Sequence, residues 1–191
     1  MTVYNPRERY RSINGKKLVE IRVRSALQLF DARDPAPFRA RDLDDDFAEY
    51  VMASAEEIGS DPMKIVILVE EPENPEIKAE AITESIRSFL LYQIDLRRLQ
   101  LTKLFRTVRL FLGIGLICVV ICLFGARLVE ESLHGTPHGQ ILREGLIIFG
   151  WVSLWKPFEL ILFDWYPMYD RIRLFRRLLA TEIEVQFGRA A

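Results

Sequence analysis

The chain has 191 residues, of which 50% are hydrophobic and 28% are charged, and its formal net charge is -1. This balance lacks the concentrated basic face of a nucleic-acid-binding protein, so we expect no nucleic-acid partner. Residues 110–125 carry no charge, so the average composition combines a charged part and an apolar part.

Residues 1–74 are expected to form a small cytoplasmic α/β domain. Alternating apolar and charged residues at 18–24 predict a half-buried strand. The apolar segment 64–69 predicts a central strand covered on both faces. Between them, a helix is expected to begin at Asp42 or Asp44 and to end at about Ile58. This order favours a parallel pair of strands, and the absence of a signal peptide in residues 1–17 favours a cytoplasmic N-terminus.

A loop rich in aspartate, arginine and proline lies between the first strand and this helix. Its aspartates do not follow calcium-loop spacing, because the central glycine and the final glutamate are missing, and we predict no metal site. One hypothesis is a protein-binding loop, and the alternative is a set of caps, turns and Arg–Asp pairs. The candidate interaction residues are Phe30, Asp31, Asp34, Pro35, Pro37, Phe38, Arg41 and Asp42.

Helical periodicity continues from Pro75 into two apolar segments. We predict an amphipathic stalk helix at 75–107, a first transmembrane helix at 108–129, an external loop at 130–140 and a second transmembrane helix at 141–163. A helix needs about 20 residues to cross a bilayer, and the first segment meets that length.

Basic residues flank this hairpin on the side away from the short loop. They are Arg97, Arg98, Lys103, Arg106 and Arg109 before the first span, and Arg171, Arg173, Arg176 and Arg177 after the second. Positive charge is retained on the cytoplasmic side, so we expect both termini inside and the loop outside.

Small residues recur at spacings of three and four in the first span and form one stripe, which comprises Gly115, Cys118, Cys122 and Ala126. Such stripes let membrane helices approach closely, so the stripe predicts a helix partner, either the second span or another copy of the chain. The two cysteines are poorly placed for a disulfide with each other and lack further metal ligands.

Lys156 and Glu159 form a candidate intramembrane polar site in the second span. Charged residues inside a membrane usually face a partner or water, which would favour a polar gate or an ion path. The alternative is that the apolar core of the span lies at about 141–155 and that both charges lie at the inner interface. Pro157 removes the donor for the Ser153 carbonyl and predicts a kink.

Two further elements follow the second span. A basic amphipathic juxtamembrane helix is predicted at 164–180, with its arginines at anionic headgroups. Alternating residues at 181–187 predict a strand that joins an edge of the N-terminal sheet, giving about three strands with the apolar one in the middle. On this arrangement Arg22 and Arg24 complement Glu182 and Glu184 in charge. The fold class is therefore an α+β membrane protein.

The segments 28–44, 155–159 and 164–167 carry a resemblance to a known group. Their sequences are QLFDARDPAPFRARDLD, WKPFE and DWYP, and the first contains an LFDxxDPxPFxxRDLD-like pattern. They resemble bacterial two-span inner-membrane proteins of uncharacterised activity, and the resemblance covers about residues 19–185. It implies placement in the bacterial inner membrane and carries over no functional residue.

The sequence contains no phosphate-binding glycine loop, nucleophile elbow or cluster of metal ligands, so we predict neither catalysis nor a cofactor. We expect a non-catalytic inner-membrane protein, namely a homo-oligomeric scaffold or regulatory subunit. Its expected partners are membrane lipids, other copies of itself and another membrane or cytoplasmic protein. The alternatives are an oligomeric ion- or solute-conducting pore and, with least support, a membrane-bound enzyme.

Overall fold

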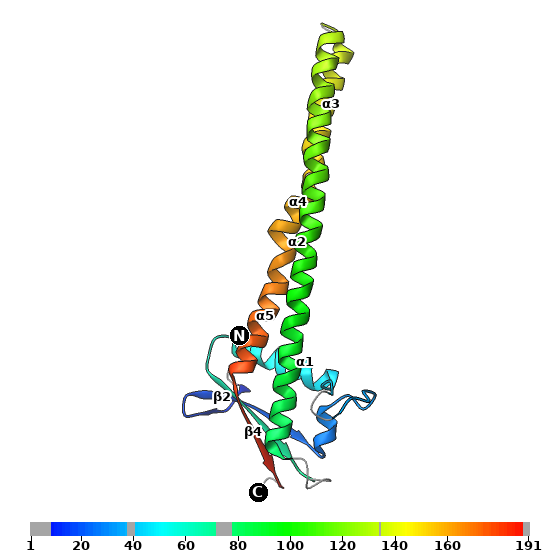
Figure 1. Cartoon of the computed structure of the whole chain (residues 1–191). Coiled ribbons are helices and arrows are strands. Elements are labelled where there is room, and N and C mark those ends of the chain that lie inside the picture. Colours follow the sequence, from blue (N-terminus) through cyan, green and yellow to red (C-terminus); the bar gives the residue numbers. More distant parts are fainter. Residues whose placement is uncertain (1–8, 38–40, 72–77, 134, 189–191) are drawn as a thin grey trace. The chain divides into compact units, whose positions relative to one another are not determined.

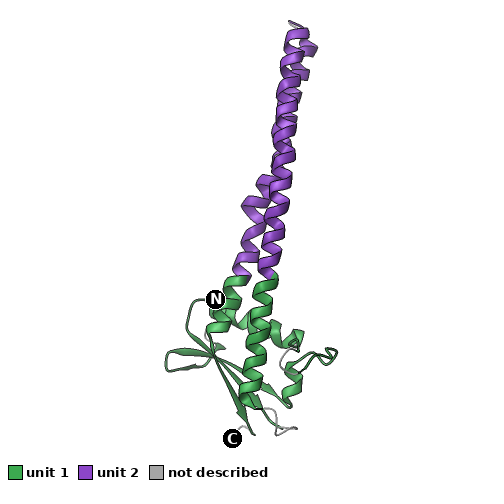
Figure 2. Ribbon diagram, in the orientation of Figure 1, with its two compact units in different colours: residues 1–96, 172–191 green, residues 97–171 purple. Residues whose placement is uncertain are grey.

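The computed structural model describes residues 9–37, 41–71, 78–133 and 135–188. The chain divides into two compact units (Figure 2). Unit 1 comprises residues 1–96 and 172–191, and unit 2 comprises residues 97–171. The protein is thus a mixed helix and strand structure, and both ends of the chain belong to the same unit.

Unit 1 contains a four-stranded sheet in the order β1-β2-β3-β4 (Figure 1), made of β1 (Ser12–Ile13), β2 (Lys16–Val23), β3 (Met63–Val69) and β4 (Glu182–Phe187). The last three strands are parallel, and Ile65 of β3 pairs with Val19 on one side and with Ile183 on the other. The prediction that the C-terminal strand joins this sheet is therefore confirmed, as is the interior position of the apolar strand.

The sheet has four strands, whereas the sequence predicted about three. The additional strand, β1, pairs antiparallel with β2 through a two-residue turn at Asn14 and Gly15. Both residues have positive φ angles, 51° and 75°, which is the backbone of a type I′ turn. Asn-Gly is the residue pair that this turn favours, so the signal was present in the sequence and was missed.

Helix α1 (Asp45–Ile58) covers the sheet together with parts of two longer helices. Its N-cap is Asp44, whose carboxylate accepts the N–H groups of Asp46 and Phe47, and it ends at Gly59 with a φ of 70°. Preceding it, the short 3-10 helix η2 (Ala26–Leu29) is capped by Ser25. These caps satisfy backbone donors that the first turn leaves without helical partners.

The core of unit 1 lies between one face of the sheet and three helices. Residues 79–96 of α2 (Ala79–Ser132) and residues 172–180 of α5 (Trp165–Ala180) pack there beside α1. Ile65 and Ile183 meet side chains of all three helices around a small apolar cavity. The buried helix residues that recur at helical spacing are Phe47, Val51, Ile82, Ile86, Leu90, Phe175 and Leu178.

The prediction that the apolar strand is covered on both faces is wrong. Met63, Ile65, Ile67 and Val69 are buried, whereas the alternate side chains of β3 are only half-buried. Among the described residues, the three helices supply one covering layer on the Ile65 face. The second face therefore remains open to solvent.

Unit 2 contains two antiparallel helical segments joined by a short connection. Its first segment is the continuation of α2 to Ser132, and its second comprises α3 (Pro137–Ser153), α4 (Trp155–Glu159), the π-helical turn η4 (Leu160–Asp164) and the start of α5. The second segment leaves α-helical geometry at Leu154 and again at η4. The break at Leu154 lies one turn before Pro157, as a missing N–H at that proline predicts.

Candidate functional site

The loop that the sequence singled out is held in shape by its own aspartates. The Asp34 carboxylate accepts the backbone N–H groups of Ala36, at 2.9 Å, and Asp42, at 2.8 Å. The Asp31 carboxylate accepts the Arg33 N–H, at 2.9 Å, and its Nε, at 3.0 Å. The Arg33 side chain lowers the pKa of Asp31, and the two backbone donors lower the pKa of Asp34. These carboxylates therefore have structural partners within the loop.

The other candidate residues of this loop differ in exposure. Phe30 is only 2% exposed and forms an antiparallel bridge with Leu43, so it belongs to the core of unit 1. Pro35, Pro37 and Asp42 are exposed, and Arg41 is half-buried, whereas Phe38 lies outside the described residues. No group of three potential metal ligands occurs within the described part of the chain.

The uncovered face of the sheet is a second candidate surface. We call it the open sheet face, and it comprises Lys16, Leu18, Glu20, Arg22, Lys64, Val66, Leu68, Glu182, Glu184 and Gln186. Together with the β1–β2 hairpin it surrounds a hollow of about 500 Å³. Parallel sheets are usually covered on both faces, so half-buried Val66 and Leu68 in a parallel strand indicate that a covering layer is missing.

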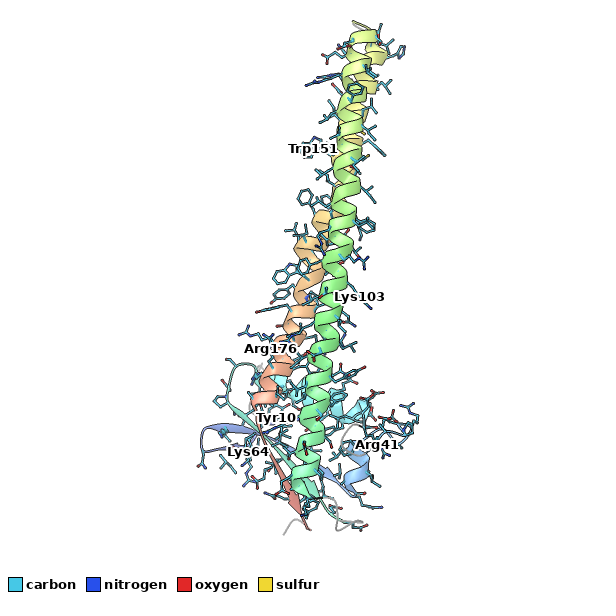
Figure 3. The ribbon with its side chains drawn as sticks, in the orientation of Figure 1. Tyr10, Arg41, Lys64, Lys103, Trp151 and Arg176 are labelled. Carbon is cyan, nitrogen blue, oxygen red and sulfur yellow. The ribbon has the colours of Figure 1, made fainter. Side chains whose placement is uncertain are left out.

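Charged side chains form a network on the open sheet face. Lys64, which is labelled in Figure 3, contacts Glu182 and Glu184, with both Nζ–Oε distances at 2.6 Å. Lys16 contacts the other oxygen of Glu182 at 2.8 Å. The two ammonium groups lower the pKa of Glu182 to about 2, and the two carboxylates raise the pKa of Lys64.

The charge complementarity predicted between the first and last strands produces no ion pair that joins Arg22 or Arg24 to the last strand among the described residues. Strand β3 separates β2 from β4, so Arg22 and Arg24 cannot be cross-strand neighbours of Glu182 and Glu184. Instead, the Nε atom of Arg22 lies 3.7 Å from the Oε1 atom of Glu70. The sequence could not reveal Lys64 as the partner, because that residue appeared only as the polar first member of an apolar strand.

Arg177 has a structural position inside unit 1. Its guanidinium donates to the carbonyl oxygen of Ala55, at 3.0 Å, and to that of Asp61, at 2.8 Å. These carbonyls lie at the C-terminal end of α1 and just beyond it, where a cation is favourable. Burial lowers the pKa of Arg177. We expected this arginine at lipid headgroups, and the structure places it against α1 instead.

The small-residue stripe in unit 2 faces the second segment of the same chain. A Cβ added at Gly115 would lie 2.8 Å from Leu154 Cδ2, and one added at Gly150 would lie 3.2 Å from Cys122 Cβ. The Ser153 hydroxyl donates to the Gly150 carbonyl at 2.6 Å, and it also lies 3.3 Å from the Gly115 carbonyl. Of the two partners that the sequence left open, the stripe therefore contacts the second helical segment of its own chain.

Lys156 and Glu159 form an ion pair on the surface of the second segment. Lys156 Nζ lies 3.1 Å from a carboxylate oxygen of Glu159, and both side chains are substantially exposed. The pair lies next to the helix irregularities at Leu154 and η4. The two opposite charges are partners for each other, which reduces the cost of placing either in an apolar environment.

Comparisons of the chain with protein-family models, curated proteins and solved structures found no match. The resemblance noted from the sequence stays an expectation.

Proposed function

We propose that this chain is an integral membrane protein in which unit 2 crosses the bilayer twice and unit 1 acts as a non-catalytic scaffold or regulatory domain. The exposed apolar surface of unit 2 carries the proposal. The helical segments Ala79–Ser132 and Pro137–Ala180 have the length and composition to cross a membrane. In the most apolar 18-residue stretch of each segment, only 17% and 22%, respectively, is buried. A core helix of a soluble protein would be mostly buried, whereas a lipid-facing helix exposes its apolar side chains.

Individual side chains support the same proposal. Trp151, labelled in Figure 3, is 67% exposed, and large apolar residues are exposed on both segments of unit 2. The basic residues that flank the segments favour an orientation with both termini in the cytoplasm. Together with the resemblance to bacterial two-span proteins, these features support our proposal that the protein lies in the bacterial inner membrane.

The open sheet face is the surface through which we propose that unit 1 associates with a second copy. It carries two lysines, Lys16 and Lys64, and two glutamates, Glu182 and Glu184, so the same patch on two subunits can be complementary in charge. Val66 and Leu68 supply apolar area beside these charges. The small-residue stripe gives no support to self-association, because it contacts the second span of its own chain.

The pore hypothesis has less support than the scaffold. Its candidate residues, Lys156 and Glu159, pair with each other and so need no water-filled path to offset their charges. The structural roles of Asp31 and Asp34 likewise weaken the hypothesis of a protein-binding loop.

Membrane insertion and orientation are tested by cysteine labelling. In a variant with Cys118 and Cys122 replaced by alanine, single cysteines are introduced at Gln140 and at Ser88. In intact bacterial spheroplasts, a membrane-impermeant maleimide should label the Gln140→Cys variant, and it should label the Ser88→Cys variant only after lysis. Extraction of the protein by alkaline carbonate, or labelling of both variants before lysis, would contradict the proposal.

Self-association is tested by photo-crosslinking in native membranes. A photoreactive phenylalanine at Val66 should yield a covalent dimer of the 22.3 kDa chain. The same residue at Tyr92, an exposed position on α2, is the matched control and should yield none. A crosslink from Val66 to a different protein would contradict the homo-oligomer and would indicate a regulatory complex with that protein. No crosslink at Val66 would contradict association through the open sheet face.

A further inference from the structure

A groove lies along unit 2 near the connection between its two helical segments. Its apolar wall consists of Val120, Leu123 and Phe124 of α2 and Ile147 of α3, and its volume is about 400 Å³. Val120 and Phe124 are 66% and 65% exposed. The wall is therefore continuous with the apolar outer surface of the helices, and it can hold a hydrocarbon chain.

Charged side chains close the end of this groove nearest the connection. Arg127 and Glu130 of α2 and Arg143 of α3 line it, and Arg143 Nε lies 3.2 Å from a carboxylate oxygen of Glu130. Arg127 forms no hydrogen bond or ion pair with the other residues that the structure describes. Two guanidiniums and one carboxylate leave a net charge of one positive unit, which complements a single phosphodiester.

The apolar and charged parts lie in the order that an amphipathic ligand requires. Val120 and Arg127 are seven residues apart on one helix, which corresponds to about 10 Å along its axis. A free phosphate would use only the arginine end and would leave the apolar wall without a ligand. A phospholipid satisfies both parts, because its phosphate can reach the arginines while an acyl chain follows Val120 and Phe124.

We propose that this groove binds one anionic phospholipid, with its phosphate at Arg127 and Arg143 and an acyl chain along the apolar wall. The site rests on the proposed function, since the groove meets lipid only if unit 2 lies in a bilayer. Glu130 limits the affinity, because it occupies Arg143 and repels the phosphate.

The first test measures lipid binding to the full-length protein in detergent by native mass spectrometry. Dioleoylphosphatidylglycerol should bind about tenfold more tightly than dioleoylphosphatidylcholine, the effect expected of a charge-assisted contact. Arg127→Gln and Arg143→Gln should each remove this preference, whereas Glu130→Gln should strengthen phosphatidylglycerol binding. Arg109→Gln, which lies on α2 outside the groove, is the control and should keep the preference. Equal binding of the two lipids by the unmodified protein would overturn the proposal.

A second pair of variants separates the groove from general charge attraction. Val120→Trp fills the groove, whereas Ile121→Trp adds the same side chain at the neighbouring position, which does not line it. Both positions are similarly exposed, at 66% and 65%. Phosphatidylglycerol binding should fall about tenfold in the first variant only. Equal binding by both variants would overturn the site.

Competition with the water-soluble headgroup distinguishes a lipid from an anion. Glycerophosphoglycerol at millimolar concentration should leave phosphatidylglycerol bound, and its displacement of the lipid would indicate an anion site instead. A protein that labels as a two-span membrane protein but shows no lipid preference would refute this site alone. A protein that fails the labelling test would refute the proposed function itself.

Discussion

At the residue scale, the ion pairs of Glu182 link the stability of unit 1 to pH. Its carboxylate lies between Lys16 and Lys64, and these cations lower its pKa from about 4.5 to about 2. A carboxyl whose pKa is lower in the folded state stabilises the fold above its unfolded pKa. That stabilisation is lost as the pH falls through the folded pKa.

We therefore expect Glu182→Gln to lower the urea midpoint of unit 1 at pH 7. The difference from the unmodified protein should be constant above about pH 5 and should shrink between pH 4.5 and 2. It should also shrink in high salt, because the ion pairs are partly exposed. The measurement is circular dichroism of the full chain in detergent.

The control for this experiment is Glu49→Gln, at an exposed position of α1 that forms no ion pair with other described residues. It should leave the urea midpoint unchanged at every pH. A pH-independent difference between Glu182→Gln and the unmodified protein would show that the ion pairs do not stabilise the fold.

At the element scale, the two segments of unit 2 pack through their smallest residues. Gly115 lies against Leu154 and Ser153, and Gly150 lies against Cys122. Small residues let two helices approach closely, and such close approach supplies the contacts that hold these two segments together. The break at Leu154 places that residue opposite Gly115.

Replacing Gly115 by leucine should destabilise the hairpin, because its new Cβ would overlap Leu154 and the Ser153 carbonyl. The expected cost is about 1–3 kcal/mol, typical of overpacking. The measurement is unfolding in a sodium dodecyl sulfate titration, followed by circular dichroism.

Gly113→Leu is the matched control, since nothing lies within 4 Å of a Cβ built there. Both variants replace glycine by leucine in the same helix, so their helix propensities change equally. The difference between them therefore reports packing alone. Equal stabilities would argue that the two segments do not pack through this stripe.

At the scale of the whole molecule, unit 1 is assembled from both ends of the chain. Strand β4 follows unit 2 in sequence and pairs with β3 along six residues, from Lys64↔Glu182 to Val69↔Phe187. Unit 2 is thus an insertion between two neighbouring strands of one sheet. Folding of unit 1 consequently depends on contacts that span most of the sequence.

Ending the chain at Thr181 should reduce the local stability of unit 1, because β3 keeps its pairing with β2 but becomes an edge strand on its other side. We expect limited proteolysis of residues 9–71 to be roughly tenfold faster, a factor that corresponds to about 1.4 kcal/mol of local stability. A chain that ends at Gly188 keeps β4 and should resist proteolysis like the full chain. Equal cleavage of the two truncated proteins would contradict a structural role for β4.

The share of the structure that could be predicted from the sequence is different at each of these scales. Strand β4 was predictable because Ile183, Val185 and Phe187 alternate with polar residues, and a lone strand needs a sheet to join. The β1 strand was missed although Asn14-Gly15 indicates a hairpin. The sequence did not show whether Asp34 has a structural or a functional role. Its carboxylate accepts the N–H groups of Ala36 and Asp42, and the second of these comes close only when the loop folds back on itself.

The sequence by itself determined the two long apolar helices and the alternating strands, because these depend on the period of neighbouring residues. Only the tertiary structure decided that Gly115 contacts the second segment of unit 2, that Glu182 pairs with Lys64 and that one face of a parallel sheet is open. Each of these features joins residues that are far apart in the chain. Local periodicity indicates which face of an element is apolar, and packing decides what covers that face.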